Sequence, residues 1–249
     1  KPINVKVFKN ETLNYTLQKV LIRRGIDINN ELDDYLSPSE LPNPEYHFNE
    51  LSNATNRIIE ACNRNEKIAI CGDYDADGIT STVLLVELLS KLGGLVKAYI
   101  PSRIDDGYGL NLRMINEINS NGVKLIITVD NGISAIAAIK KSKEFGIDLI
   151  ITDHHMIPNF RLDVFALIHP QKTPINSPYK FLAGVGIAYM LAINICRRLD
   201  YDINKTTAKV FFCIGTIADM APLKGANRKW LKEYLPQINL SSNIGIKSI

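Results

Sequence analysis

The sequence predicts a doubly wound α/β fold with a mainly parallel sheet, and two observations carry this prediction. Short runs rich in Ile, Val and Leu recur along the middle of the chain, and segments with helical spacing separate them. Strands that are apolar along their whole length are typical of parallel sheets, because helices cover both faces. A helical preface precedes this region and a helical tail follows it, so the predicted architecture is α/β with helical additions at both ends.

The N-terminal segment, residues 1–45, is predicted to be a helical extension. ETLNYTLQKVLIRRG places Leu17 and Leu21 among its apolar residues at helical spacing and ends at a glycine. NNELDDYL predicts a short second helix that stops before Pro38. The proline-rich SPSELPNPEYHF then marks a linker, and a further helix is expected over about 51–62.

Five strands and three connecting helices follow the linker. Every connection between the first four strands is long enough for the crossover helix that parallel strands require. The tail from about Phe181 predicts three more helices. The predicted strands are 67–71, 96–100, 124–129, 148–152 and 165–169, and the connecting helices lie near 79–92, 110–119 and 133–145.

Composition restricts the class of protein but not its partner. The 249 residues are 46% hydrophobic and carry 29 basic and 26 acidic side chains, so the net charge of +3 indicates no general preference for polyanions. The four cysteines form no CxxC pair, which is typical of a reducing compartment. The chain has no signal core, and no run approaches the roughly 18 apolar residues of a spanning helix, so we expect a soluble cytoplasmic protein.

Acidic side chains and two histidines follow the predicted strands at the point where each strand ends. Ligands of parallel sheets bind beyond the carboxyl ends of the strands, so these side chains are expected to converge. Several carboxylates at one edge need a compensating cation, and carboxylates with imidazoles favour Mn²⁺ or Mg²⁺. A pair of such ions suits phosphoester hydrolysis. The residues are Asp73, Asp75, Asp77, Arg103, Asp130, Asp153, His154 and His155.

Each of these segments also has a purely structural interpretation. DADG is a common turn composition, and VDNGIS fits an Asx turn that starts a helix near Ser134. A pair of histidines can lie on an ordinary surface, Arg103 can form a surface ion pair, and Asp219 can end a helix. Their shared position beyond separate strands is what favours a site.

Four segments resemble motifs I to IV of the DHH phosphoesterase superfamily: GDYDADGITS, VDNGIS, TDHH and GTIADMAPL, in this order. YIPSRIDDGYGL, FLAGVGIAYMLA and LKGANRKWLKEYL are similar to its branch of 5′→3′ exonucleases specific for single-stranded DNA. The resemblance spans nearly the whole chain and implies a DHH catalytic domain over 46–249. It also implies a metal-dependent phosphodiesterase that releases 5′-mononucleotides in DNA repair and recombination.

The resemblance also implies roles for individual residues. Asp73 is either a further metal ligand or a carboxylate behind the ligands. His155 is expected to face the scissile phosphate, Asp153 to orient a neighbouring imidazole, Arg103 to contact phosphate and Asp130 to bridge two ions. The implied ligands of the Mn²⁺ or Mg²⁺ ions are Asp75, Asp77, Asp130, His154 and Asp219.

Members of this superfamily continue into a second domain, called DHHA1, and the exonuclease branch adds an OB-fold. This chain ends at SSNIGIKSI, about where the linker helix to that domain is expected, so we expect the catalytic N-terminal part of such an enzyme. The expected partners are single-stranded DNA with a 5′ end and a single-strand-binding protein or helicase, with no membrane.

Three other functions stay open at this point. Relatives that hydrolyse oligoribonucleotides or cyclic dinucleotides share the fold and metals, although GDYDADG and the helical preface favour the exonuclease branch. A receiver-like signalling domain also places acidic residues at strand ends, but the adjacent histidines and Asp219 argue against it. A binding relative without catalysis is the third, and intact candidate ligands in all four motifs argue against it.

Overall fold

The computed structural model describes residues 13–27, 32–104, 107–159, 161–240 and 244–248. It divides the chain into two compact units, Lys1–Glu40 and Leu41–Ile249. The first unit contains α1 (Tyr15–Arg23) and α2 (Leu32–Leu36), as predicted, and residues 1–12 and 28–31 of the predicted extension lie outside the described residues. Leu21 and Leu32 are buried together, whereas Leu17 on the predicted apolar face of α1 is exposed.

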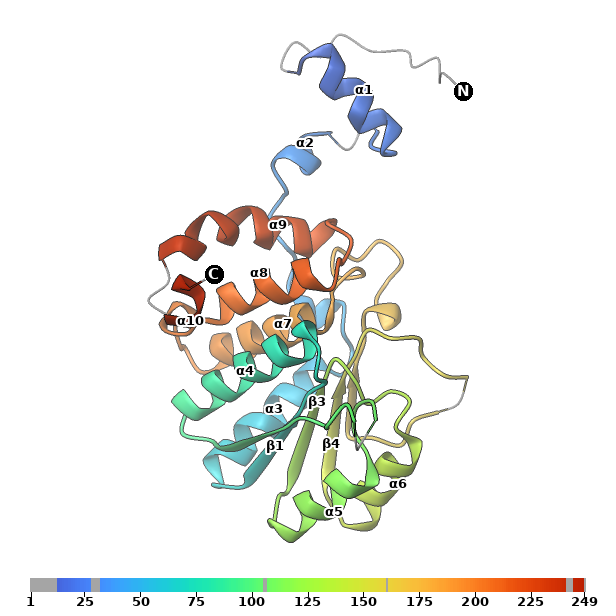
Figure 1. The fold of residues 1–249 in the computed structure, drawn as a ribbon, viewed down its shortest axis with the longest axis vertical. Coiled ribbons are helices and arrows are strands. Elements are labelled where there is room, and N and C mark those ends of the chain that lie inside the picture. Colours follow the sequence, from blue (N-terminus) through green and yellow to red (C-terminus); the bar gives the residue numbers. More distant parts are fainter. Residues whose placement is uncertain (1–12, 28–31, 105–106, 160, 241–243, 249) are drawn as a thin grey trace. The chain divides into compact units, whose positions relative to one another are not determined.

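The second unit is built on a five-stranded parallel sheet in the order β2-β1-β3-β4-β5 (Figure 1). The prediction of a doubly wound parallel sheet is confirmed, and every strand lies within one or two residues of its predicted limits. The strands are β1 (Lys67–Cys71), β2 (Leu95–Tyr99), β3 (Leu125–Val129), β4 (Asp148–Thr152) and β5 (Ala166–Ile168).

Residues on the inner strands β1, β3 and β4 alternate between two hydrophobic cores. Ile68 and Ile70 face one core, and Ala69 and Cys71 face the other. Successive side chains of a strand point to opposite faces, so an unbroken apolar strand is covered on both sides. This explains why these inner strands carry no polar face, whereas the edge strand β2 exposes Lys97.

Helices cover both faces of the sheet. The core on one face contains residues of α3, α4, α7, α8 and α9, and the core on the other contains residues of α5 and α6. Figure 1 shows α7, α8 and α9 as successive helices on the same side as α4. The bounds are α3 (Leu51–Asn63), α4 (Ala76–Lys91), α5 (Leu112–Ser120), α6 (Ile136–Glu144), α7 (Gly184–Arg198), α8 (Ala208–Ala218), α9 (Gly225–Tyr234) and α10 (Ile244–Lys247).

The register aligns the ends of the strands at one edge of the sheet. Cys71 pairs with Tyr99 and with Thr128, and Val129 pairs with Thr152. The ladder continues one residue further, because the backbone N–H of Asp130 donates to the carbonyl oxygen of Thr152 at 3.0 Å. The residues that follow β1, β3 and β4 therefore emerge side by side.

No helix among the described residues combines the length and the hydropathy that a membrane-crossing helix needs.

Candidate metal centre

The loop after β1 holds its three aspartates in different environments. Asp75 is the exposed N-cap of α4, and its Oδ1 accepts the backbone N–H of Gly78 at 2.8 Å. Gly78 has to be glycine, because a Cβ there would lie 2.6 Å from the backbone nitrogen and oxygen of Asp73. This tight turn buries Asp73 and Asp77 and leaves Asp75 outside.

Asp77 caps the N-terminus of α7. Its two carboxylate oxygens accept the backbone N–H groups of Gly184 and Val185, each at 2.7 Å. The helix has no side-chain cap of its own, so this carboxylate satisfies N–H groups that would otherwise be unpaired. Burial raises the pKa of Asp77; the negative charge of Asp219 adds to the rise, and the N–H of Val185 opposes it.

Asp130 follows β3 in a left-handed backbone conformation, with φ +60°. The conformation costs on the order of 1 kcal/mol for a residue other than glycine, so the surrounding contacts must impose it. One of these is α7, because a Cβ on Gly184 would lie 2.5 Å from the Cβ of Asp130. Burial and the nearby charge of Asp77 raise the pKa of the Asp130 carboxyl.

His154 lies between the buried carboxylates. Its Nε2 is 3.0 Å from Asp130 Oδ1 and 3.8 Å from Asp77 Oδ2. The nearer contact is a close ion pair without hydrogen-bond direction, since Asp130 Oδ1 has no well-directed donor. Burial lowers the pKa of His154, but Asp130, Asp77 and Asp219 outweigh it and raise the value to about 9. A proton on His154 therefore supplies the positive charge that these carboxylates need.

Asp153 fixes the position of His155 through hydrogen bonds to its ring and its backbone. Its Oδ1 lies 2.7 Å from His155 Nδ1 and accepts the His155 backbone N–H at 3.0 Å, while its Oδ2 accepts the N–H of Ile133. Burial disfavours the charged carboxylate, but these hydrogen bonds outweigh it and keep the pKa of Asp153 below its usual range. The predicted contact between Asp153 and an imidazole is thus present, and the imidazole is that of His155.

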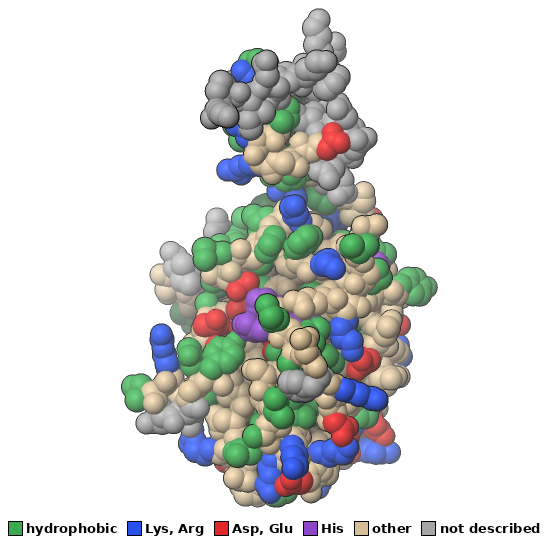
Figure 2. Space-filling view, turned by 90° about the vertical axis from the view of Figure 1, so that its right-hand side faces the viewer, with side chains coloured by type: hydrophobic (Ala, Val, Ile, Leu, Met, Phe, Trp, Pro, Cys, Tyr) green, Lys and Arg blue, Asp and Glu red, His purple; other side chains and the backbone are tan. Residues whose placement is uncertain are grey.

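Five predicted residues lie close enough to share a metal. One group is Asp130, His154 and His155, and the other is Asp77, His154 and Asp219 at the end of α8, each with donor atoms within 4.8 Å of one another. Because His154 belongs to both groups, the two form one continuous centre. Figure 2 shows histidine side chains at the surface with acidic side chains beside them.

Four predicted site residues lie outside these groups, and one of them is Asp153, described above. Asp75 is exposed at the rim, although its charge contributes to raising the pKa values of Asp130 and Asp219. Asp73 is buried, and neither of its carboxylate oxygens has a hydrogen-bond partner among the described residues. The guanidinium of Arg103 is exposed and lies 5.5 Å from the centre of the Tyr74 ring.

Several residues that support the centre were not predicted. Asn131 donates from Nδ2 to the carbonyl oxygens of Cys71 and Val129 and accepts the N–H of Leu110, so it ties β1 and β3 to the loop before α5. His169 is buried after β5, and its Nε2 lies 2.6 Å from the carbonyl oxygen of His155. The only sequence signal was their position beside Asp130 and after the last strand.

The donor atoms of the centre fit a divalent cation that prefers oxygen and nitrogen. The nearest cysteine, Cys71, is fully buried, and burial raises the pKa of its thiol, so no thiolate is offered. The carboxylates of Asp73, Asp77 and Asp130 are all buried, and His154 is the cation in contact with the last two. Such a set suits Mn²⁺ or Mg²⁺ better than a structural zinc site.

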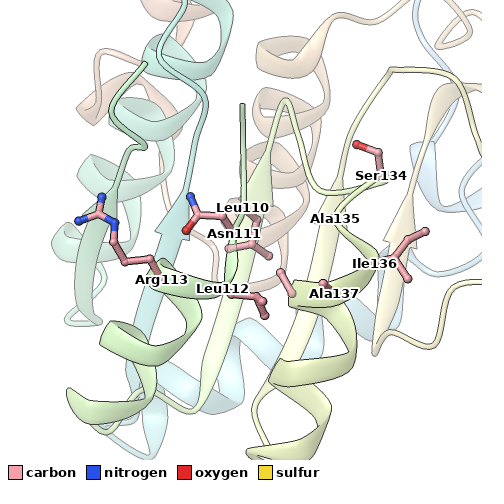
Figure 3. A pocket seen from close by; sticks show the side chains of 9 residues that line it. Leu110, Asn111, Leu112, Arg113, Ser134, Ala135, Ile136 and Ala137 are labelled. Carbon is pink, nitrogen blue, oxygen red and sulfur yellow. The ribbon is translucent and has the colours of Figure 1, made fainter. Parts of the chain in front are cut away.

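A groove of about 580 Å³ lies beside the centre, between the first turns of α5 and α6 (Figure 3). It begins at Leu110, which Asn131 holds, and its walls include the exposed apolar side chains of Leu112 and Ile136. Arg113 and Ser134 add polar groups to the lining. The groove is therefore mainly apolar, and Ser134 in its lining belongs to the same connection between β3 and α6 as Asp130.

Comparison with known proteins agrees with this geometry. The model of the DHH family, N-terminal domain, matches residues 67–216. The exonuclease RecJ of Bacillus subtilis, named as specific for single-stranded DNA, is 37% identical over 92% of this chain. The protein of the same name from Haemophilus influenzae is 36% identical over 88%. This chain spans only 29% and 39% of the lengths of these two relatives.

Solved structures of RecJ have the same fold as this chain. Exonuclease RecJ bound to manganese superposes with a TM-score of 0.74 at 34% identity, over 81% of this chain and 51% of that one. RecJ from Thermus thermophilus in complex with Mn²⁺ superposes with a TM-score of 0.75 at 30% identity, over 93% and 32%. The family match includes the whole sheet and every candidate ligand except Asp219. This chain belongs to the DHH family, whose N-terminal domain it contains.

Proposed function

We propose that this chain is the catalytic part of an exonuclease that hydrolyses single-stranded DNA from its 5′ end and releases 5′-mononucleotides. The observation that carries the proposal is the pair of donor groups that share His154 at the carboxyl edge of the sheet. The names of the similar relatives, all exonucleases specific for single-stranded DNA, supply the substrate class. The catalytic domain in this proposal comprises residues 46–249.

The proposed cofactor is Mn²⁺ or Mg²⁺, as two ions. Asp77, Asp130, His154 and Asp219 would hold them, with Asp75 completing the set from the rim and Asp73 supporting it from behind. When bound, the ions would activate a water molecule and neutralise the charge that develops on the phosphate. The manganese and magnesium complexes of the similar RecJ structures support this choice.

The protein's own groups orient the substrate. Asp153 fixes Nδ1 of His155, which leaves Nε2 to donate a hydrogen bond to a non-bridging oxygen of the scissile phosphate. Arg103, stacked over Tyr74 beside the aspartate loop, would bind a phosphate by charge and direct hydrogen bonds. These two cationic contacts would orient the phosphodiester for attack.

The groove between α5 and α6 would accept an unpaired nucleotide of the strand. Its apolar walls suit the faces of bases, which are accessible only in single strands. An enzyme restricted to single strands needs a supplier of them, so a single-strand-binding protein or a helicase is the proposed partner.

The test is a substrate panel assayed with this chain and Mn²⁺. It contains 5′-phosphorylated single-stranded DNA, the same sequence as duplex, a short RNA and cyclic and linear dinucleotides. The proposal expects mononucleotides from single-stranded DNA in preference to the others. Cleavage of dinucleotides alone would replace it with a function as an oligoribonuclease or cyclic-dinucleotide phosphodiesterase, and Asp130→Asn controls for contaminating nucleases.

A further inference from the structure

The hydroxyl of Tyr108 lies within hydrogen-bond distance of two groups of the centre. It donates to the backbone carbonyl oxygen of Asp130 at 3.0 Å, and it lies 3.3 Å from Nε2 of His155. The two groups follow different strands, β3 and β4, whereas Tyr108 belongs to the connection between β2 and α5. One side chain therefore links three separate segments of the sheet edge.

One arrangement of the hydrogen atoms satisfies every group of this network, and in it both ring nitrogens of His155 carry a proton. A phenol has a single proton, and when it is donated to the Asp130 carbonyl the oxygen can only accept from His155. His155 then donates from Nε2 to Tyr108 and from Nδ1 to Asp153, so that all three groups are satisfied. The phenol oxygen occupies the direction in which Nε2–H points.

We propose that Tyr108 is a positioning residue of this centre, which fixes the backbone of Asp130 and the direction of the His155 imidazole through one hydroxyl group. The proposal rests on the proposed function, because it assigns His155 Nε2 to the substrate phosphate. When a phosphate oxygen takes the place of the phenol oxygen, the imidazole is already aligned, so little reorganisation precedes the reaction.

The hydrogen bond from Tyr108 to the carbonyl oxygen of Asp130 helps to hold the left-handed backbone of Asp130. A strained conformation persists only where its surroundings over-determine it, and Asp130 uses both of its backbone polar groups, N–H to Thr152 and C=O to Tyr108. Loss of the hydrogen bond from Tyr108 would leave the Asp130 carboxylate on a less constrained backbone. The position of the donor atoms at this strand end thus depends on a side chain from another loop.

The ring of Tyr108 is itself held in place. It makes edge-on contacts with Tyr74 and His155, with ring centroids 6.2 and 5.8 Å apart. The next residue but one, Leu110, is tied to Asn131 by its N–H. Replacing the tyrosine by phenylalanine would keep these contacts and remove only the hydroxyl.

The kinetic test compares Tyr108→Phe with Tyr99→Phe. Tyr99 ends β2 in the same part of the chain, and its hydroxyl accepts a hydrogen bond from Asn121 away from the centre, so the control also removes one bonded hydroxyl. Loss of one aligning hydrogen bond is expected to lower kcat for single-stranded DNA by about tenfold in Tyr108→Phe, with KM changed less than about twofold. The control should keep both constants.

A second measurement does not depend on activity. The chain has four histidines, so nitrogen-15 correlation spectra of the imidazoles can be assigned in the Mg²⁺-loaded protein. The proposal expects the Nε2 signal of His155 to move in Tyr108→Phe, while His47 and all signals of Tyr99→Phe stay in place. An unchanged His155 signal overturns the proposal. If that signal moves while the unaltered protein cleaves no DNA, the positioning role stands and the proposed function fails.

Discussion

His154 is the side chain that both donor groups share, and we propose that its protonation is coupled to cation binding. Without a metal its pKa is raised to about 9 by the carboxylates, although burial opposes this. A raised histidine pKa stabilises the fold below the ordinary value near 6.5, and this contribution is lost as the pH rises through about 9. A metal ion held by His154 would need the neutral imidazole, so its binding would expel the proton.

We therefore predict that Mn²⁺ binding at pH 7.5 releases protons and becomes tighter as the pH rises towards about 9. Isothermal titration calorimetry in two buffers of different ionisation enthalpy measures this directly, because released protons add the buffer's heat. Equal heats in both buffers, or an affinity that falls with pH, would show that His154 is not protonated in the free centre.

Asp130 offers the second prediction at the residue scale. Asn is the substitution to use, because it tolerates the left-handed conformation of this residue better than Ala does and keeps the shape of the side chain. Asp130→Asn removes one charge from the centre and should lower kcat by more than about 100-fold. Loss of a group that only hydrogen-bonds to a metal ligand costs up to about 100-fold, so a larger loss indicates a direct ligand. The thermal midpoint should stay close to that of the unaltered protein. Activity within about tenfold of normal would contradict the assignment.

At the residue scale, the types and positions of the candidate ligands could be predicted from the sequence. Which of them are buried in the centre and which lie at its rim could not. The family resemblance implied that Asp75 and Asp77 are both metal ligands, yet one is an exposed helix cap and the other is buried against α7. The difference depends on residues about a hundred positions away, which local composition does not contain. Tyr108 and His169 were missed because their roles arise only from tertiary contacts.

At the scale of elements, the N-terminus of α7 joins the helical tail to the centre. The backbone N–H groups of Gly184 and Val185 bind Asp77, and the missing side chain of Gly184 lets the helix approach Asp130. The sequence of the tail predicted this helix. Nothing in that segment indicated that an aspartate from another loop would cap the helix.

Gly184→Ala tests this packing. The added Cβ would lie 2.5 Å from the Cβ of Asp130, so helix and strand end must move apart, at a cost of about 1–3 kcal/mol in the free energy of unfolding. Metal affinity should fall as well, because Asp77 and Asp130 would separate. The measurements are chemical denaturation and Mn²⁺ titration.

Gly186→Ala is the matched control in the same helix. A Cβ there would meet Leu182, at 2.9 Å from its Cδ2 and 3.2 Å from its Cβ, so this variant crowds the same helix without crowding Asp130. If both variants lose stability equally and both retain normal metal affinity, α7 is packed against the sheet without positioning the centre.

At the scale of the whole molecule, the fold class followed from sequence because the apolar strands are unbroken and evenly separated. The strand order β2-β1-β3-β4-β5 did not follow from sequence, and it is also the order of flavodoxin-like folds, which include receivers. The family match and the α7–α9 layer, together with the centre, separate this chain from those domains. The groove beside α5 and α6 was not predicted, because it arises from the spacing of two helices rather than from any motif.

We propose above all that the carboxyl edge of this sheet binds the metal ions of a nuclease. The most direct measurement is an anomalous difference map from crystals soaked in Mn²⁺, with Asp130→Asn crystals as the control. We predict manganese peaks among the donor atoms of Asp77, Asp130, His154 and Asp219, and their loss or weakening in the variant. Well-ordered side chains with no peak among them, at a Mn²⁺ concentration that supports DNA cleavage, would contradict the account.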